Sequence, residues 1–129
     1  EYSADGRISK LIGHHERVTP MGTFQTTLER ESFGIGMSTV RTIGIPGAGL
    51  LLFSSTTPIE PNRTISRWLI TVTKNLVDLV GEEFQQNLVK GVEDDMRIWK
   101  HKVHRKQPVF CKEDKFLGEY RQWVKQFYV

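Results

Sequence analysis

The hydrophobic positions change their spacing part-way along the chain, from every second residue to every third or fourth. In the first half, apolar and polar residues alternate, β-branched and aromatic side chains are frequent, and glycine or proline marks the short loops. This pattern predicts four β-strands, at residues 23–31, 37–43, 49–55 and 64–73. Successive strands joined by short loops favour an antiparallel meander.

The second half of the chain has a helical pattern. From about residue 78 to about residue 102 the apolar side chains recur at three and four positions, which predicts one long α-helix. Pro108 interrupts the chain after this helix. Asp114 can then cap a second, shorter helix over residues 115–128.

The predicted fold class is α+β, with a single domain over residues 1–129. An antiparallel β-sheet carries a long C-terminal helix packed across it, in the helix-grip-like layout of pocket-forming domains, and a short terminal helix follows. The domain divides into residues 1–20 without a clear pattern, a β-meander over 23–73 and a helical region over 78–128. Apolar side chains of the strands should face the long helix. They are Phe24, Leu50, Leu52 and Leu69 from the sheet, opposite Phe84, Leu88 and Val92 from the helix.

Asp95 lies near the middle of the apolar face of the predicted long helix. Successive helical residues rotate by about 100°, which places the following residues with Asp95 in an arc of about 120°: Phe84, Leu88, Gly91, Val92, Ile98 and Trp99. Phe84, Leu88, Val92 and Trp99 are predicted to line a substrate pocket, and Asp94 lies at the edge of the face. An unpaired carboxylate in an apolar interior costs several kcal/mol, so Asp95 needs a cation, a hydrogen-bonded partner or a bound proton.

Three roles are open for Asp95 at this point. It can be a buried acid that is satisfied by an arginine of the sheet or by backbone donors. It can be a metal ligand, because a carboxylate that projects from a helix into a pocket is one corner of the two-histidine, one-carboxylate triad of non-haem iron enzymes. It can also be a catalytic acid or base, which needs no metal. The helical periodicity does not choose among them.

The histidines do not complete a metal site. His101 and His104 fall on the polar side of the long helix, well over a right angle from Asp95, where they are expected to face water. His14 and His15 are neighbours in a loop-like stretch, and two adjacent side chains rarely close on one ion. The sequence therefore offers a carboxylate without an evident pair of histidine partners.

Composition and charge are those of an ordinary globular protein. Hydrophobic residues make up 38% of the chain and charged residues 26%, and 18 lysines and arginines against 15 acidic residues give a net charge of +3. Most of the basic excess falls between Arg97 and Lys125. Because it forms no dense stripe and no known recognition module, a nucleic-acid partner is not expected.

The expected location is the cytoplasm or the cytosolic side of a membrane. Cys111 is the only cysteine, so an internal disulfide or a cysteine-ligated cluster cannot form, and a reducing compartment is permitted. The longest apolar run, at residues 48–53, is too short to span a bilayer, and no signal peptide is visible. The chain opens on Glu1 rather than on methionine, which suggests a piece of a longer protein.

The segment GVEDDMRIWKHK, at residues 91–102, resembles the end of the catalytic domain in Rieske non-haem iron oxygenases of the steroid group. This group includes the oxygenase component of 3-ketosteroid 9α-hydroxylases and the cholesterol 7-desaturases. The likeness covers roughly residues 57–128 and continues in shorter blocks. These are TPIEP at 57–61 followed by Arg67-Trp68, then Pro108-Val109, KEDK at 112–115 and YRQWVKQFY at 120–128.

The resemblance implies a role for the two neighbouring aspartates. In this family the long helix supplies the carboxylate ligand of a mononuclear Fe(II), and the second acid of the pair is the usual one. Asp95 is then the catalytic metal ligand, and Asp94 is the alternative ligand or a hydrogen-bond partner of a ligating histidine. A complete family member would use O2 to hydroxylate or desaturate a steroid or sterol held between the sheet and the long helix.

Other parts of the family's machinery do not occur in this sequence. They are the Cys-x-His and Cys-x-x-His motif of the Rieske 2Fe-2S cluster and the two iron-binding histidines that precede the carboxylate. The resemblance therefore implies a C-terminal portion of the catalytic domain that is inactive alone. Its partners would be a steroid substrate, an NAD(P)H-dependent reductase and further copies of the protein, as a trimer. The alternative is a non-catalytic helix-grip domain that binds a hydrophobic ligand and does not need Asp95.

Overall fold

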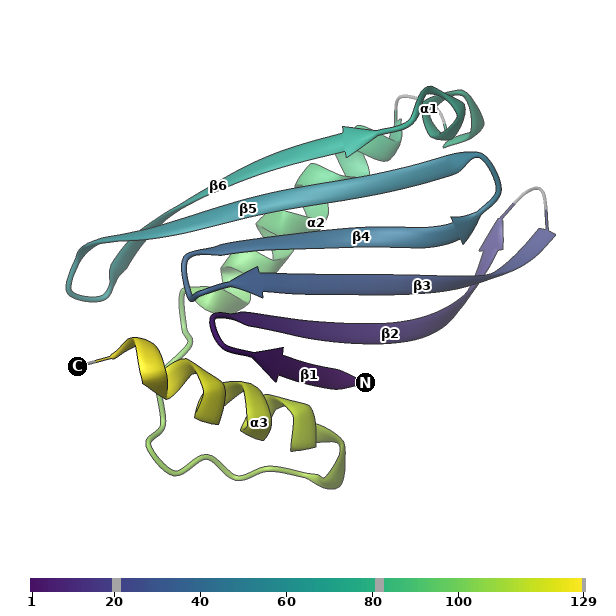
Figure 1. Ribbon diagram of the computed structural model, residues 1–129. Coiled ribbons are helices and arrows are strands. Elements are labelled where there is room, and N and C mark those ends of the chain that lie inside the picture. The colour runs from purple at the N-terminus through teal and green to yellow at the C-terminus, as the bar shows by residue number, and fades with distance from the viewer. Residues whose placement is uncertain (20–21, 81–82, 129) are drawn as a thin grey trace.

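A single antiparallel sheet of six strands dominates the computed structural model, which describes residues 1–19, 22–80 and 83–128 (Figure 1). Each strand pairs with the next one along the chain, so the sheet is a meander. The strands are β1 (Tyr2–Asp5), β2 (Ile8–Thr19), β3 (Gly22–Phe33), β4 (Met37–Ile45), β5 (Ala48–Glu60) and β6 (Arg63–Val72). Helices follow the sheet, and the predicted α+β class is confirmed.

β1 and β2 occupy the N-terminal stretch for which no pattern was predicted, so the meander starts before residue 23. β2 pairs with β3 along its whole length. Its two sides both mix apolar and polar residues, which removes the usual contrast between a buried and a solvated face. Ile8, Ile12, His14 and Glu16 alternate with Ser9, Leu11, Gly13 and His15. Pairing across the sheet, rather than local alternation, therefore defines this strand.

Two helices follow the sheet in the region where one long helix was predicted. α1 (Lys74–Val80) packs against β5, and α2 (Glu83–Trp99) runs obliquely behind the sheet in the view of Figure 1. The part of the prediction that concerns residues 81 and 82 lies outside the described residues. α2 ends at Trp99, before the predicted end near residue 102. None of the helices in the described part of the chain combines the length and apolar character needed to cross a lipid bilayer.

α2 lies over the face of the sheet that carries Trp68, which we call the inner face. The indole rings of Trp68 and Trp99 stack there, with their centroids 6.1 Å apart and their planes at 17°. Strand alternation and cross-strand register put Phe24, Leu50 and Leu52 on the same face, as predicted.

The prediction that Leu69 also faces the helix is wrong. Leu69 lies opposite Phe53, whereas Trp68 lies opposite Ser54, so Leu69 is on the outer face, where it is 60% exposed. Both sides of β6 carry large apolar residues, and alternation alone does not tell which side turns toward a helix.

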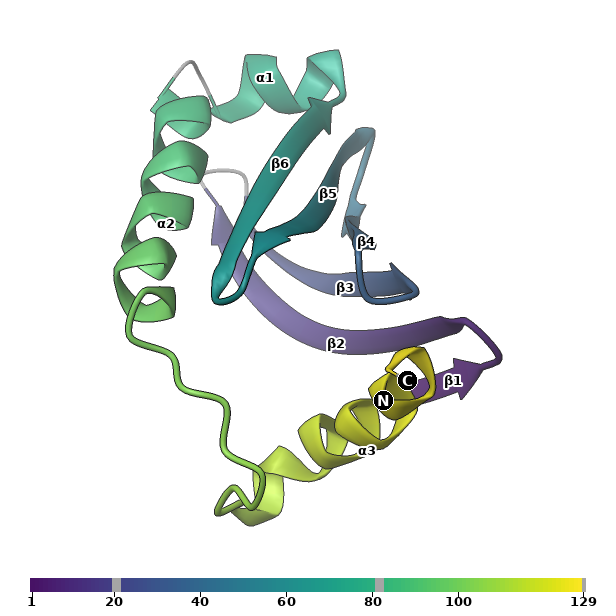
Figure 2. The same cartoon turned by 90° about the vertical axis from the view of Figure 1, so that its left-hand side faces the viewer.

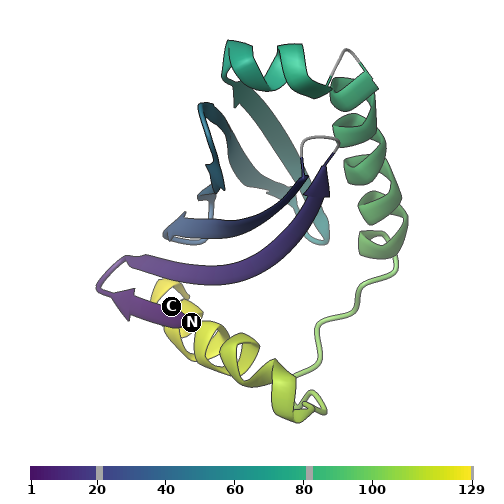
Figure 3. The ribbon, with the colours of Figure 1, turned by 90° about the vertical axis from the view of Figure 1, so that its right-hand side faces the viewer.

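α3 (Lys115–Val124) lies beside β1 and β2, flanked by the short 3-10 turns η1 (Lys112–Asp114) and η2 (Lys125–Phe127) (Figures 2 and 3). The Trp123 Nε1–H group donates a hydrogen bond to the Gly6 carbonyl oxygen at 2.9 Å, and the Gln126 side-chain amide donates to the same oxygen at 3.0 Å. The rings of Trp123 and Phe127 meet edge to face at 5.0 Å. These contacts attach the terminal helix to the β1–β2 turn.

Asp114 occupies the N-cap position of α3, as predicted, but its side chain does not bond into that helix. Oδ2 of Asp114 instead accepts hydrogen bonds from the backbone N–H of Cys111 at 3.0 Å and from the Cys111 thiol at 3.1 Å. The backbone hydrogen bond from Cys111 lowers the pKa of Asp114, and the thiol's bond to Asp114 raises the pKa of Cys111. The pair fixes the turn that leads into α3.

Candidate functional site

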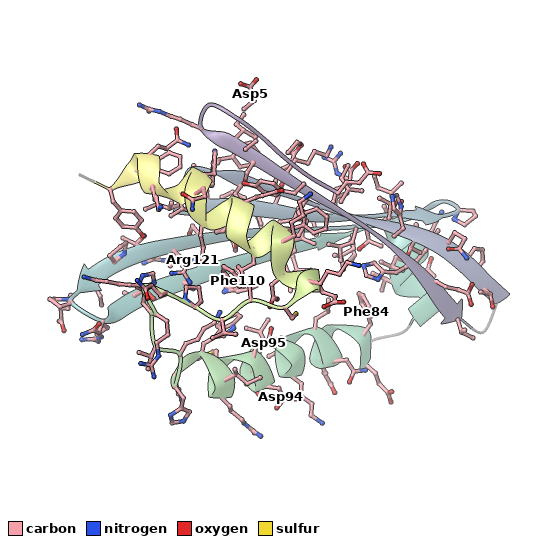
Figure 4. The ribbon with its side chains drawn as sticks, turned by 90° about the horizontal axis from the view of Figure 1, so that it is seen from below. Asp5, Phe84, Asp94, Asp95, Phe110 and Arg121 are labelled. Carbon is pink, nitrogen blue, oxygen red and sulfur yellow. The ribbon has the colours of Figure 1, made fainter. Side chains whose placement is uncertain are left out.

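The side chains predicted to form the pocket wall are only partly covered. Phe84, Leu88 and Val92 are half-buried, and Figure 4 shows Phe84 pointing from α2 toward the strands. Trp99 is 40% exposed and contacts Trp68. Ile98, which the periodicity placed on the same face, is 68% exposed. The covered face of α2 is therefore narrower at its C-terminal end than predicted.

Asp95 projects from the side of α2 that faces the sheet, as Figure 4 shows. The residue is exposed, so the prediction that its carboxylate lies in an apolar interior is wrong. Within residues 1–19, 22–80 and 83–128 this carboxylate makes no hydrogen bond and no ion pair. A buried acid satisfied by an arginine of the sheet, the first of the three roles considered, is thus not what the described residues form. The carboxylate is open to a partner from outside them.

Asp94 lies on a different side of α2, with its own partner. Its Oδ1 is 3.5 Å from Nη1 of Arg97, and the two side chains are 53% and 80% exposed. Such a solvent-exposed pair contributes little to stability. It shows, however, that Asp94 points along the helix surface, about one-quarter turn from Asp95, as the helical rotation requires.

The described part of the chain brings no three His, Cys, Asp or Glu side chains together as a metal site. His14 and His15 lie in β2 and not in a loop, and strand alternation sends them to opposite faces of the sheet. His101 and His104 follow the end of α2. A mononuclear iron site takes one carboxylate together with two histidines, so Asp95 fits such a site as one ligand and does not form it alone.

A cavity of about 370 Å³ lies between the inner face, the end of α2 and α3. Trp68 and Trp99 border it on one side, and Tyr120 of α3 borders it on another. Trp99 follows Asp95 by four residues, so both lie on the same side of the helix and the carboxylate is about one turn away from the residue that borders the cavity. The volume falls within the range of small-molecule sites, about 300–1,000 Å³.

The floor of this cavity is polar, a feature that sequence reasoning missed. Cross-strand register aligns four serines over β2 to β5 in a line that ends at Trp68 of β6. We call these four the hydroxyl row: Ser9, Ser32, Ser38 and Ser54, of which the last three line the cavity. The first three are only 3%, 4% and 9% exposed. β2, β3 and β4 each contain a single serine, and β5 contains Ser54 next to Ser55, so only the pairing of strands could have revealed the row.

A comparison with known protein families matches residues 6–128 to the 3-ketosteroid 9alpha-hydroxylase C-terminal domain. The chain belongs to this family. The steroid-oxygenase resemblance inferred from residues 91–102 is thereby confirmed.

Individual relatives of this 3-ketosteroid 9alpha-hydroxylase C-terminal domain cover part of the chain. The 3-ketosteroid-9-alpha-monooxygenase oxygenase component of Mycobacterium tuberculosis is 31% identical over 78 residues, which are 56% of this chain and 20% of the relative. Cholesterol 7-desaturase nvd of Drosophila melanogaster is 32% identical over 84 residues, 60% of this chain and 18% of the relative. The chain thus spans about a fifth of the length of these relatives.

Proposed function

We propose that this chain forms the C-terminal portion of the catalytic domain of a Rieske-type steroid oxygenase and supplies Asp95 as the carboxylate ligand of its mononuclear iron. The observation that carries the proposal is the Asp95 carboxylate on the sheet-facing side of α2, which has no partner among the residues that the structure describes, in a chain of the 3-ketosteroid 9alpha-hydroxylase C-terminal domain family. The names of the relatives, which refer to 3-ketosteroids and to cholesterol, support a steroid or sterol as the substrate.

The residues of α2 would have two roles, to bind the substrate and to ligate the metal. Phe84, Leu88, Val92 and Trp99 would cover the apolar rings of the substrate, exclude water and hold the reacting carbon near Asp95. Asp95 would hold the metal, and Asp94 could accept a hydrogen bond from a ligating histidine. The iron, when bound, supplies the activation of O2 with electrons from the Rieske 2Fe-2S cluster.

The remaining components would come from outside this chain. A single carboxylate leaves a divalent ion with too few ligands, so the two histidines and the Rieske cluster belong to other parts of the full-length protein in this proposal. We further propose an NAD(P)H-dependent reductase as the electron donor and a homotrimer as the assembly. Both follow from the resemblance to steroid oxygenases.

Oxidation of a steroid in isotopically labelled dioxygen tests this function. With the full-length protein, a reductase and NAD(P)H, we expect mass spectrometry to detect an oxidised product. Hydroxylation would add one labelled oxygen atom to the steroid, whereas desaturation would remove two hydrogen atoms and add no label. The measurement therefore also separates the two reactions that the relatives represent.

The isolated 129-residue chain is the matched control. It should form no product and retain no iron, because it contributes one ligand only. Turnover by the isolated chain would contradict the proposed division of the metal site. Tight steroid binding by the full-length protein without any iron or oxidation would instead favour the hydrophobic-ligand carrier.

We propose that the protein works at the cytosolic surface of a membrane, and the segment between α2 and α3 supports this location. Residues 100–111 run along the outside of the fold in Figure 2. Val103 and Val109 in this segment are 68% and 99% exposed. Basic side chains lie around them, at Lys100, Lys102, Arg105 and Lys106. Basic residues attract anionic headgroups, and exposed apolar side chains enter the membrane interface.

Vesicle binding by the full-length protein should therefore depend on this segment. We expect co-sedimentation with vesicles that contain phosphatidylserine and little with phosphatidylcholine alone. Replacing Lys102, Arg105 and Lys106 by glutamine should weaken binding about a hundredfold, because each of the three basic residues contributes about 1 kcal/mol near an anionic surface. The control Lys74→Gln/Lys90→Gln removes exposed charges elsewhere and should bind as before. Equal loss in both variants would argue against a role for the segment.

A further inference from the structure

The inner face of the sheet buries hydroxyl groups where a helix-covered sheet normally buries hydrocarbon. Among the described residues of the six strands, the buried side chains all carry a hydroxyl group: Ser9, Thr26, Ser32 and Ser38. Leu76, a buried apolar residue, belongs to α1. Burying a hydroxyl group costs free energy unless it is hydrogen-bonded, so each of these buried hydroxyl groups needs a polar partner.

The hydrogen bonds inside the sheet do not use all the donors and acceptors of the hydroxyl groups at the cavity. Thr26 is occupied, because its hydroxyl donates to the His15 carbonyl oxygen at 3.1 Å. Ser38 and Ser54 lie on the floor of the cavity, with their hydroxyl oxygens 2.8 Å apart. One of the two donates to the other, and neither hydroxyl group has a further side-chain partner among the described residues, which leaves the second with a free proton and both with free lone pairs. The pair can therefore both donate to and accept from a ligand.

The Ser38–Ser54 pair adjoins an aromatic wall. Ser54 lies directly opposite Trp68 on β6, and Trp68 stacks on Trp99. Indole rings give a flat, apolar contact surface with little loss of side-chain entropy. The polar floor and the aromatic wall are thus adjacent parts of the same cavity. Asp95 lies one helical turn before Trp99, on the same side of α2.

We propose that the Ser38–Ser54 pair binds the hydroxyl or keto oxygen of a flat, otherwise apolar ligand whose rings lie against Trp68 and Trp99. The inference rests on the proposed steroid function and deepens it, because it specifies how the steroid is oriented in the cavity, with its oxygen-bearing end at the serine pair. With its oxygen held at the serine pair, the ring system extends along α2, and the carbon presented near Asp95 is fixed by its distance from that oxygen. The pair would then determine the position of oxidation.

Two probes that differ in a single oxygen test the proposal: a 3-keto steroid and its 3-deoxy counterpart. Their dissociation constants for the full-length protein can be measured by quenching of tryptophan fluorescence. We expect the keto steroid to bind about tenfold more tightly, the effect of one hydrogen bond. In Ser38→Ala/Ser54→Ala this ratio should fall to about one, while the affinity for the deoxy probe stays unchanged. The double variant removes both partners together and leaves no unsatisfied hydroxyl group.

The matched control is Ser55→Ala, since Ser55 is half-buried like Ser54 but lies on the outer face, opposite Met37 and Arg67. It should keep the wild-type ratio. A shifted position of oxidation in the serine double variant would be a second, independent sign of the orienting role. If the double variant does not fold, Ser54→Ala alone must still lower the ratio.

Two failures have different meanings. An unchanged ratio in a folded serine variant would overturn the role of the pair and leave the steroid function standing. If neither probe binds the wild-type protein, the steroid function itself is wrong and the inference falls with it.

Discussion

Asp95→Ala in the full-length protein is expected to abolish both the mononuclear iron and steroid oxidation while leaving the fold intact. The substitution removes the one carboxylate from a site of two histidines and a carboxylate. It should hardly affect folding, because Asp95 is exposed and has no hydrogen-bond or ion-pair partner among the residues that the structure describes. Iron analysis should show loss of the mononuclear iron, while the visible absorption of the Rieske cluster and the circular dichroism spectrum persist.

Asp94→Ala is the matched control for this experiment. The substitution breaks the exposed ion pair with Arg97 and removes a group that could orient a ligating histidine. We expect the iron to remain and turnover to fall about ten- to hundredfold, as is usual when a group behind a metal ligand is lost. If Asp95→Ala retained its iron and Asp94→Ala lost it, the two roles would be exchanged, and α2 would have to be distorted at that point.

The side of α2 on which Asp95 lies could be predicted because every α-helix has nearly the same rotation per residue, whereas its burial could not, since the residue is exposed. The helical arithmetic put Phe84, Leu88 and Val92 on one side of α2, and all three are half-buried. The same arithmetic separated Asp94 from Asp95. Periodicity identifies the side of a helix that turns toward the sheet. It does not show how far neighbouring elements bury each residue on that side. Ile98 belongs to the predicted face and is 68% exposed for that reason.

The hydroxyl row and the N-terminal hairpin could not be predicted, because both depend on the register of strands. Ser38 is buried because it lies beside Ser32 and Ser54 in neighbouring strands, and nothing in its own strand marks it. A register shift by one residue would send the same serine to the opposite face. The prediction for Leu69 was wrong for a related reason. The helix covers one side of β6, and the sequence of the strand does not show which side that is.

Trp123→Ala is expected to loosen the attachment of α3 to the sheet. The substitution removes the hydrogen bond to the Gly6 carbonyl oxygen and the edge-to-face contact with Phe127. A fully buried tryptophan is worth roughly 3–5 kcal/mol on truncation to alanine, and Trp123 is only half-buried. We therefore expect the free energy of local opening to fall by about 2 kcal/mol, which corresponds to about thirtyfold faster amide hydrogen exchange in α3 and the β1–β2 turn.

Hydrogen exchange in the full-length protein, followed by mass spectrometry, resolves this effect by segment. Among the described residues, the hydrogen bond and ring contacts of the Trp123 side chain go to Gly6, Tyr120 and Phe127, so α1 and the β4–β5 hairpin should exchange at the wild-type rate and serve as the internal control. Trp123→Phe keeps a ring against Phe127 but removes the N–H donor, so its effect should be smaller, about 1 kcal/mol. Tyr128→Ala, at a site that is 68% exposed, should change little. Unchanged exchange in α3 of the Trp123→Ala protein would show that contacts other than the tryptophan hold the terminal helix.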